Sequence, residues 1–85
     1  MTEQFKRLKE LYASMRQHGF IDADLSDLII ALADVGFRPG IYYTGKYWRA
    51  HINVGTSVWH DGKSPISAVK GAIKRQLTFM RKYPS

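Results

Sequence analysis

The repeat of apolar residues along this chain changes at the segment Arg38-Pro39-Gly40. Before this segment, apolar residues recur every three or four positions, which is the repeat of an amphipathic helix. After it, apolar and polar residues alternate, which is the repeat of a strand with one buried face. The chain has 85 residues, the size of one domain. We therefore expect a single α+β domain over residues 1–85, with a helical hairpin over residues 1–37 and a strand-rich unit over residues 38–85.

Two helices are predicted before the change. The first covers residues 2–18 and the second covers residues 24–35, each with its apolar residues along one face. Asp22 or Asp24 is expected to cap the start of the second helix. Both helices are followed by glycine and then phenylalanine, as expected where a left-handed glycine ends a helix and the next residue packs back on it. These dipeptides are Gly19-Phe20 and Gly36-Phe37.

Three antiparallel strands are predicted after the change. They cover residues 41–43, 47–54 and 57–60, with a turn at residues 44–46 and a tight turn at Gly55. Because each strand follows the previous one after a short turn, the strands should form a meander.

A last helix is predicted to follow the sheet. Residues 61–63 should turn out of the sheet, Ser64 should cap the helix, and Pro65 should occupy its first position. The helix should run to about Lys82 and pack on the sheet, which gives the order ααβββα. The residues expected in the core of this unit are Trp48, Ile52, Val54, Ile66, Val69, Ile73 and Leu77.

The basic charge of the chain belongs to its second part. The net charge is +6. Residues 1–37 hold four Lys and Arg against six acidic residues, a net charge of −2, whereas residues 38–85 hold nine against one, a net charge of +8. Such a charge distribution attracts polyanions, either a nucleic acid or an acidic protein surface. The alternative is a basic surface that only keeps the protein soluble.

The residue types and their spacing disfavour metal, cofactor and catalytic sites. The chain has no cysteine, which excludes disulfides, thiolate zinc sites and cysteine nucleophiles. Its three histidines have no second ligand at metal-binding spacing. Gly62-Lys63-Ser64 looks like the end of a phosphate-binding loop, but that loop needs a glycine where the chain has Ser57. We therefore expect no metal site, no cofactor and no enzymatic activity.

The distribution of apolar residues predicts neither a signal peptide nor a membrane span. The first ten residues are mostly polar and charged, and the longest apolar run is the six residues from Leu28 to Ala33. We expect a cytoplasmic protein without membrane partners, either a monomer or a homodimer.

One face of the middle strand is rich in residues that recognise nucleic acids. Arg and Asn read base edges in the DNA major groove, Lys binds phosphate, and Tyr stacks on unpaired bases. The alternative is that these residues only favour strands and that the helical hairpin covers this face. The candidate residues on and beside this face are Tyr42, Lys46, Tyr47, Arg49, His51 and Asn53, and basic residues in and before the last helix, Lys63, Lys70, Lys74 and Arg81, are expected to support them.

A known family pattern runs through this region. The run GIYYTGKYWRAHI, residues 40–52, is followed by a strand and by a helix that opens at Ser64-Pro65 and contains Ala68 and Ala72. About 35 residues, roughly 40–75, thus resemble the three-strand-plus-helix DNA-binding modules of phage integrase arm domains and plant ethylene-response factors. In those modules the sheet enters the major groove. The resemblance implies that Tyr42, Lys46, Tyr47, Arg49 and His51 lie at the groove.

Two functions from different classes fit these observations. The first is a small basic accessory or regulatory protein, of phage or mobile-element origin, that binds nucleic acid, with DNA expected in preference to RNA. The second is a non-enzymatic inhibitor of the phage type, such as an anti-defence protein, that binds an acidic surface of a host protein. The orientation of Trp59 and of the polar strand face separates them, because an open face favours nucleic acid.

Overall fold

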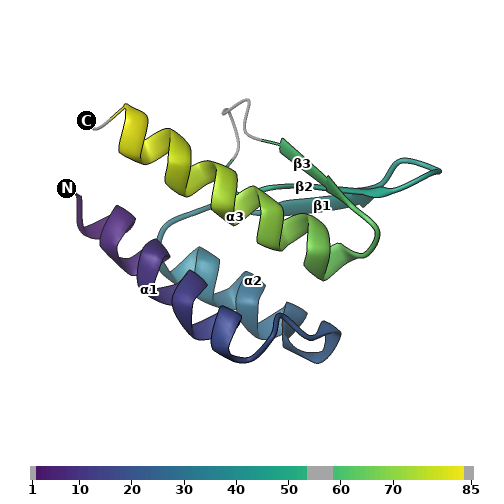
Figure 1. The fold of residues 1–85 in the computed structure, drawn as a ribbon, viewed down its shortest axis with the longest axis horizontal. Coiled ribbons are helices and arrows are strands. Elements are labelled where there is room, and N and C mark those ends of the chain that lie inside the picture. The colour runs from purple at the N-terminus through teal and green to yellow at the C-terminus, as the bar shows by residue number, and fades with distance from the viewer. Residues whose placement is uncertain (1, 54–58, 84–85) are drawn as a thin grey trace.

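The protein folds as three α-helices and a three-stranded antiparallel sheet (Figure 1) in a computed structural model that describes residues 2–53 and 59–83. The predicted α+β class and the order ααβββα are confirmed. The elements are α1 (Glu3–Gln17), a 3₁₀ turn (Asp22–Asp24), α2 (Leu25–Asp34), β1 (Gly40–Tyr43), β2 (Trp48–His51), β3 (Trp59–Gly62) and α3 (Pro65–Lys82).

The first two helices end as their sequences predict. Gly19 and Gly36 have φ angles of 81° and 100°, which place them in the left-handed region. The N–H of the phenylalanine after each glycine donates to the carbonyl five residues earlier, at 3.1 Å after α1 and 3.0 Å after α2. Phe20 and Phe37 are both buried. Each glycine therefore ends its helix and directs an aromatic ring into the core.

The start of α2 differs from the prediction. Asp24 makes no capping hydrogen bond through its side chain, and its backbone is helical rather than extended. Asp22 lies in the 3₁₀ turn that leads into α2, so neither aspartate caps α2 as expected. The carboxylate of Asp24 instead lies 3.8 Å from Nδ1 of His18, at the end of α1.

The sheet has the order β1-β2-β3, and β3 ends later than predicted. Asp61 and Gly62 were expected to turn out of the sheet, but they are the last two residues of β3. The reason is a pair of opposite charges, because Asp61 lies directly across from Arg49 and binds its guanidinium group.

The middle strand is shorter than predicted. Strand β2 begins at Trp48 and ends at His51, and the chain bends at Ile52 and Asn53. The bend still buries Ile52 completely. Val54, the turn at Gly55 and the predicted start of the third strand at residues 57–58 lie outside the described residues.

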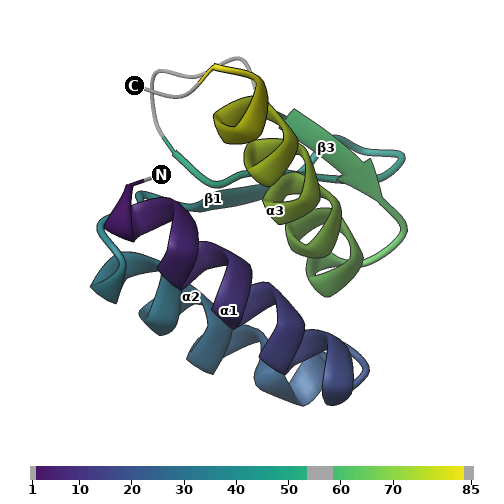
Figure 2. The same ribbon diagram turned by 60° about the vertical axis from the view of Figure 1, so that its left-hand side comes forward.

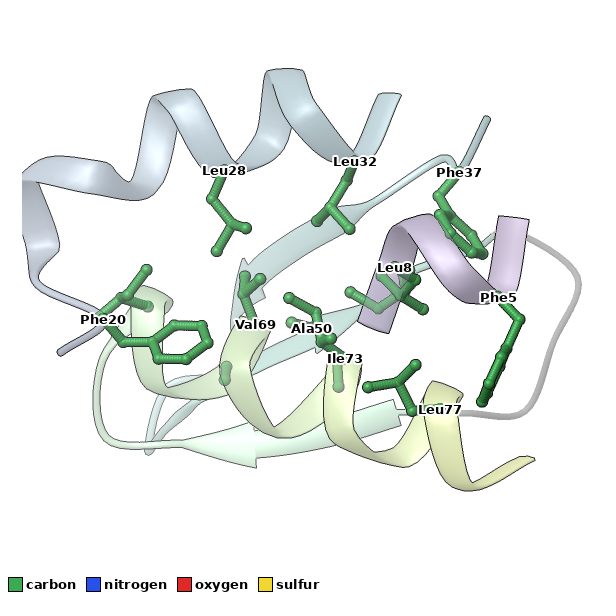
Figure 3. Close-up of a cluster of buried hydrophobic side chains, with 14 residues drawn as sticks. Phe5, Leu8, Phe20, Leu28, Leu32, Phe37, Ala50, Val69, Ile73 and Leu77 are labelled. Atoms are coloured by element: carbon green, nitrogen blue, oxygen red, sulfur yellow. The ribbon is translucent and has the colours of Figure 1, made fainter. Parts of the chain in front are cut away.

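All three helices lie on one face of the sheet, which we call the inner face (Figures 1 and 2). Figure 3 shows Leu28 and Leu32 of α2 pointing toward Val69 and Ile73 of α3 and toward Ala50 of β2. The helical hairpin therefore contributes to the core on the inner face and leaves the opposite face of the sheet uncovered.

The predicted core is largely confirmed. Ile52, Ile66, Val69, Ile73 and Leu77 are buried. Trp48 is only partly buried and packs against Tyr43, with ring centroids 5.2 Å apart. Both residues lie near the tip of the β1–β2 hairpin, which extends past the helices (Figure 1).

A close contact joins α3 to the edge of the sheet. His60 is paired with the buried Ala50, so its ring faces α3. A Cβ atom at Gly71 would overlap the His60 imidazole. The absence of a side chain at Gly71 therefore allows α3 to lie directly on β3.

Replacement of the buried Ile73 by alanine should lower the free energy of unfolding by about 2 to 5 kcal/mol, because it opens a cavity between α3 and the sheet. Chemical denaturation with circular dichroism measures this change. Ile30→Ala is the matched control, since Ile30 is 60% exposed on α2. Equal stability of the two variants would contradict the described core.

The Gly71→Ala substitution should also destabilise the protein, by about 1 to 3 kcal/mol, because the added methyl group overlaps His60. Alanine stabilises a helix by about 1 kcal/mol relative to glycine, so without the overlap Gly71→Ala would raise the stability of the protein. The double variant Gly71→Ala/His60→Ala should be less destabilised than the sum of the single variants. Additive effects in this double-mutant cycle would rule out the contact.

Candidate functional site

The face of the sheet opposite the helices, which we call the outer face, displays the predicted recognition residues. The cross-strand register places Tyr42 opposite Arg49, Arg49 opposite Asp61, and His51 opposite Trp59. Tyr42 and Trp59 remain 44% and 38% exposed. The outer face is therefore an accessible surface that spans all three strands.

Three aromatic side chains form a ledge across the outer face: Tyr42 from β1, His51 from β2 and Trp59 from β3. The Tyr42 and Trp59 rings meet edge to face, with centroids 6.0 Å apart, and the His51 and Trp59 rings do so at 4.6 Å. A Cβ atom at Gly40 would overlap the His51 ring, so the glycine leaves room for this ring beside β1. The mutual contacts hold the ledge in one arrangement.

Arg49 is fixed beside this ledge by a two-point ion pair. Its Nε lies 2.7 Å from Oδ1 of Asp61, and its Nη2 lies 3.3 Å from Oδ2. The same Nη2 donates to the Tyr47 hydroxyl at 3.0 Å, and the guanidinium carbon lies 5.5 Å from the centre of the Tyr47 ring. The orientation of the guanidinium group is thus set by β2 and β3 together.

The ion pair shifts the pKa of both partners. The hydrogen bond from Arg49 lowers the pKa of Asp61 below its ordinary value, and the hydrogen bond to Asp61 raises the pKa of Arg49. Both groups are therefore charged at neutral pH, and their charges cancel. The outer face consequently offers aromatic surface and an oriented guanidinium group rather than a large excess of positive charge.

A hollow of about 690 Å³ lies at the β3 edge of the outer face. It is lined by Tyr42, Arg49, Trp59 and Asp61, together with His60 and Arg75. Arg75 comes from α3, and its positive charge further lowers the pKa of Asp61. Trp59, Asp61 and Arg75 were not among the predicted site residues. The alternation along β3 could have shown that Trp59 and Asp61 share a face, but the position of Arg75 depends on how α3 packs.

The remaining candidate residues do not all gather at this hollow. Lys46 is exposed in the turn between β1 and β2, where its N–H lies 3.4 Å from the Thr44 hydroxyl oxygen. Asn53 follows β2 and is half-buried, and Lys63 is exposed between β3 and α3.

The basic residues of α3 face another part of the molecule. Nζ of Lys70 lies 5.3 Å from the centre of the Phe20 ring, at the end of α1. Lys74 and Arg81 line a groove between α1 and α3. Of the predicted site residues, Tyr42, Tyr47, Arg49 and His51 thus belong to the outer face of the sheet, and Lys74 and Arg81 belong to the α1–α3 groove. Lys46, Asn53, Lys63 and Lys70 are not among the residues that line the hollow or the groove.

Two further observations concern metal ions and membranes. Within residues 2–53 and 59–83, no group of three or more His, Cys, Asp or Glu side chains is arranged to hold a metal ion. In the same ranges, no helix combines the length and the apolar character that a membrane span requires.

The Asp61→Asn variant should show how the ion pair contributes to stability. The pKa of Asp61 is lowered in the folded protein, so its pairing stabilises the fold above about pH 4, the ordinary pKa of an aspartate. This contribution to stability is lost as the pH falls through the lowered pKa of Asp61. The variant should therefore have a lower Tm than the parent at pH 7, and the difference should shrink between pH 4 and pH 2.

Thermal melts at a series of pH values measure this difference. Asp34→Asn, at an exposed position at the end of α2, is the control. Its difference in Tm from the parent should not shrink in the same way between pH 4 and pH 2. A constant difference between the parent and Asp61→Asn from pH 7 to pH 2 would mean that the ion pair does not stabilise the fold.

No protein-family model, no curated protein and no solved structure matches this chain. The resemblance of residues 40–75 to the DNA-binding modules stays a prediction, although the strand and helix order that it implies is present.

Proposed function

We propose that this protein binds nucleic acid and that unpaired bases stack on the aromatic ledge of the outer face. The observation that carries the proposal is the exposure of Tyr42 and Trp59 on one open sheet face beside Arg49. Stacking on an aromatic ring accepts every base, because each base has a π-face, and a neighbouring cation binds the backbone. The net charge of +6 favours the same class of ligand.

The hydrogen bonds that Arg49 already makes favour the stacking of unpaired bases over the recognition of a base edge in a duplex. A bidentate contact to guanine needs two adjacent N–H donors of one guanidinium group. In Arg49 the edge formed by Nε and Nη2 is occupied by Asp61, and Nη2 also donates to Tyr47. Nη1 lies outside this edge, and it can bind a phosphate of a strand that lies across the ledge.

Lys46 and Arg75 extend the same surface. Lys46 lies in the turn between β1 and β2, beyond the ends of these strands, and Arg75 lies at the β3 edge. A strand that crosses the sheet from β1 to β3 would meet the positive charge of Arg75 at the β3 edge. We propose DNA in preference to RNA as the ligand, and an accessory or regulatory role for the protein.

A second candidate function is binding to an acidic protein surface. The observation in its favour is the composition of the outer face, since Tyr, Trp and Arg are the residues that dominate the energy of protein interfaces. The cancelled charges of Arg49 and Asp61 also suit a partner that is less charged than a nucleic acid.

Tyr42→Ala and Trp59→Ala should each weaken binding to a short single-stranded oligonucleotide by about 1 to 3 kcal/mol, roughly 5-fold to 150-fold in Kd, because each removes a stacking surface. Fluorescence anisotropy with a labelled 12-nucleotide strand of mixed sequence, as DNA and as RNA, measures the change. Tyr43→Ala is the matched control, since Tyr43 is the next residue on β1, faces the other side of the sheet and is 56% exposed.

Three results would count against this proposal. If Tyr42→Ala and Trp59→Ala bind the single strand as tightly as Tyr43→Ala does, the ledge is not the binding surface. If the parent binds a duplex but no single strand, the resemblance to groove-binding modules becomes the better guide. If the parent binds no DNA and no RNA at about 50 mM salt, where electrostatic contacts are strong, an acidic protein partner becomes the leading hypothesis.

A further inference from the structure

A groove of about 650 Å³ runs between α1 and α3 and gathers four positive charges. Helix α1 contributes Lys9 and Arg16, and helix α3 contributes Lys74 and Arg81. No carboxylate is among the residues that line the groove. In the described part of the chain the ion pairs join His18 to Asp24 and Arg49 to Asp61, so the four groove cations are not paired.

The arrangement of the four cations follows from helix geometry. On each helix the two cations are seven residues apart, which is two turns, so they lie on the same side about 10.5 Å from each other along the axis. Helices α1 and α3 pack against each other (Figure 2). Two rows of positive charge therefore flank the groove. Along one strand of duplex DNA, about 10.5 Å corresponds to the rise of about three nucleotides.

The floor of the groove between the two rows is largely apolar. Tyr12 of α1 and Leu77 of α3 contribute to it. Leu77 is buried, and Tyr12 packs on Phe20 with ring centroids 5.5 Å apart. The floor is therefore held by the core, while the exposed cations at the rim can adjust to a ligand. Such a groove suits a chain that carries negative charges at regular intervals, as a phosphodiester backbone does.

The groove and the aromatic ledge lie on different sides of the molecule. Helix α3 covers the inner face of the sheet, and the groove lies on the side of α3 that meets α1. The ledge is on the outer face of the sheet, opposite the helices. A nucleic acid on the ledge therefore leaves the groove accessible.

We propose that the α1–α3 groove is a second binding site, which holds the phosphodiester backbone of duplex DNA without reading its sequence. The identity of this ligand rests on the proposed nucleic-acid function, whereas the location of the site does not depend on the ledge. Duplex DNA is the ligand that we propose, because it carries one negative charge per about 1.7 Å of its axis, about twice the density of one of its strands, and the four groove cations can neutralise several of these phosphates. One protein molecule would then hold a single strand and a duplex at the same time.

The test compares the salt dependence of duplex binding among variants. The groove variant Arg16→Gln/Lys74→Gln removes one charge from each row, at two exposed positions. The control variant Arg7→Gln/Arg38→Gln removes two charges at exposed positions that do not line the groove. Anisotropy with a labelled 20-base-pair duplex, between 50 and 200 mM salt, gives the slope of log K against log salt. Circular dichroism melts check that both variants fold.

The parent should bind the duplex with an affinity that falls steeply with salt. The groove variant should reduce the magnitude of the slope by about 1.8, since each phosphate contact on duplex DNA contributes about 0.9. The control variant should change the slope less, because Arg7 and Arg38 do not line the groove and therefore do not contact a backbone held in it. The ledge variant Tyr42→Ala/Trp59→Ala should bind the duplex as the parent does.

The possible failures can be told apart. If the groove variant keeps the slope of the control variant, or if the parent binds no duplex at 50 mM salt, the groove is not a backbone site, whatever the ledge does. If the ledge variant binds the single strand like the parent while the groove variant loses duplex binding, the proposed role of the ledge is wrong and the groove site stands. If the ledge variant also loses duplex binding, the two surfaces are one site and the inference is overturned.

Discussion

The packing of α3 determines the rest of the structure. One side of this helix buries Val69 and Ile73 completely against the sheet and the other helices. Because the core is concentrated on the inner face, the outer face needs no cover and can display aromatic residues. The same helix also packs beside α1, and this contact forms the basic groove. Both candidate surfaces are therefore consequences of where α3 lies.

The fold could be predicted from local patterns because most of its elements are locally determined. The helix ends depend on Gly19 and Gly36, whose left-handed conformation is a local property. The start of α3 depends on Ser64, whose hydroxyl accepts from the N–H of Ser67 at 3.2 Å. The end of β3 depends instead on Arg49, 12 residues from Asp61 in the chain, and no local pattern at Asp61 reveals that partner.

The candidate site was only partly predictable for the same reason. Alternation along β2 correctly placed Arg49 and His51 on one face of the sheet. The contribution of α1 was missed because residues 1–37 carry a net negative charge as a group. Lys9 and Arg16 become part of a positive surface only when α1 packs against α3. A count of charges along the sequence adds together all faces of a helix. Only the tertiary packing determines which face, and therefore which charges, lie beside another helix.

The contact between Gly71 and His60 limits how this sequence can change during evolution. A side chain at position 71 has no space while the imidazole remains at position 60. Any lineage that gains a larger residue at position 71 must first, or at the same time, accept a smaller one at position 60, or else move α3 away from β3. Such a movement would alter the hollow that α3 and β3 share through Arg75 and Asp61. Among homologues these two positions should vary together, and a pair of large residues should be absent.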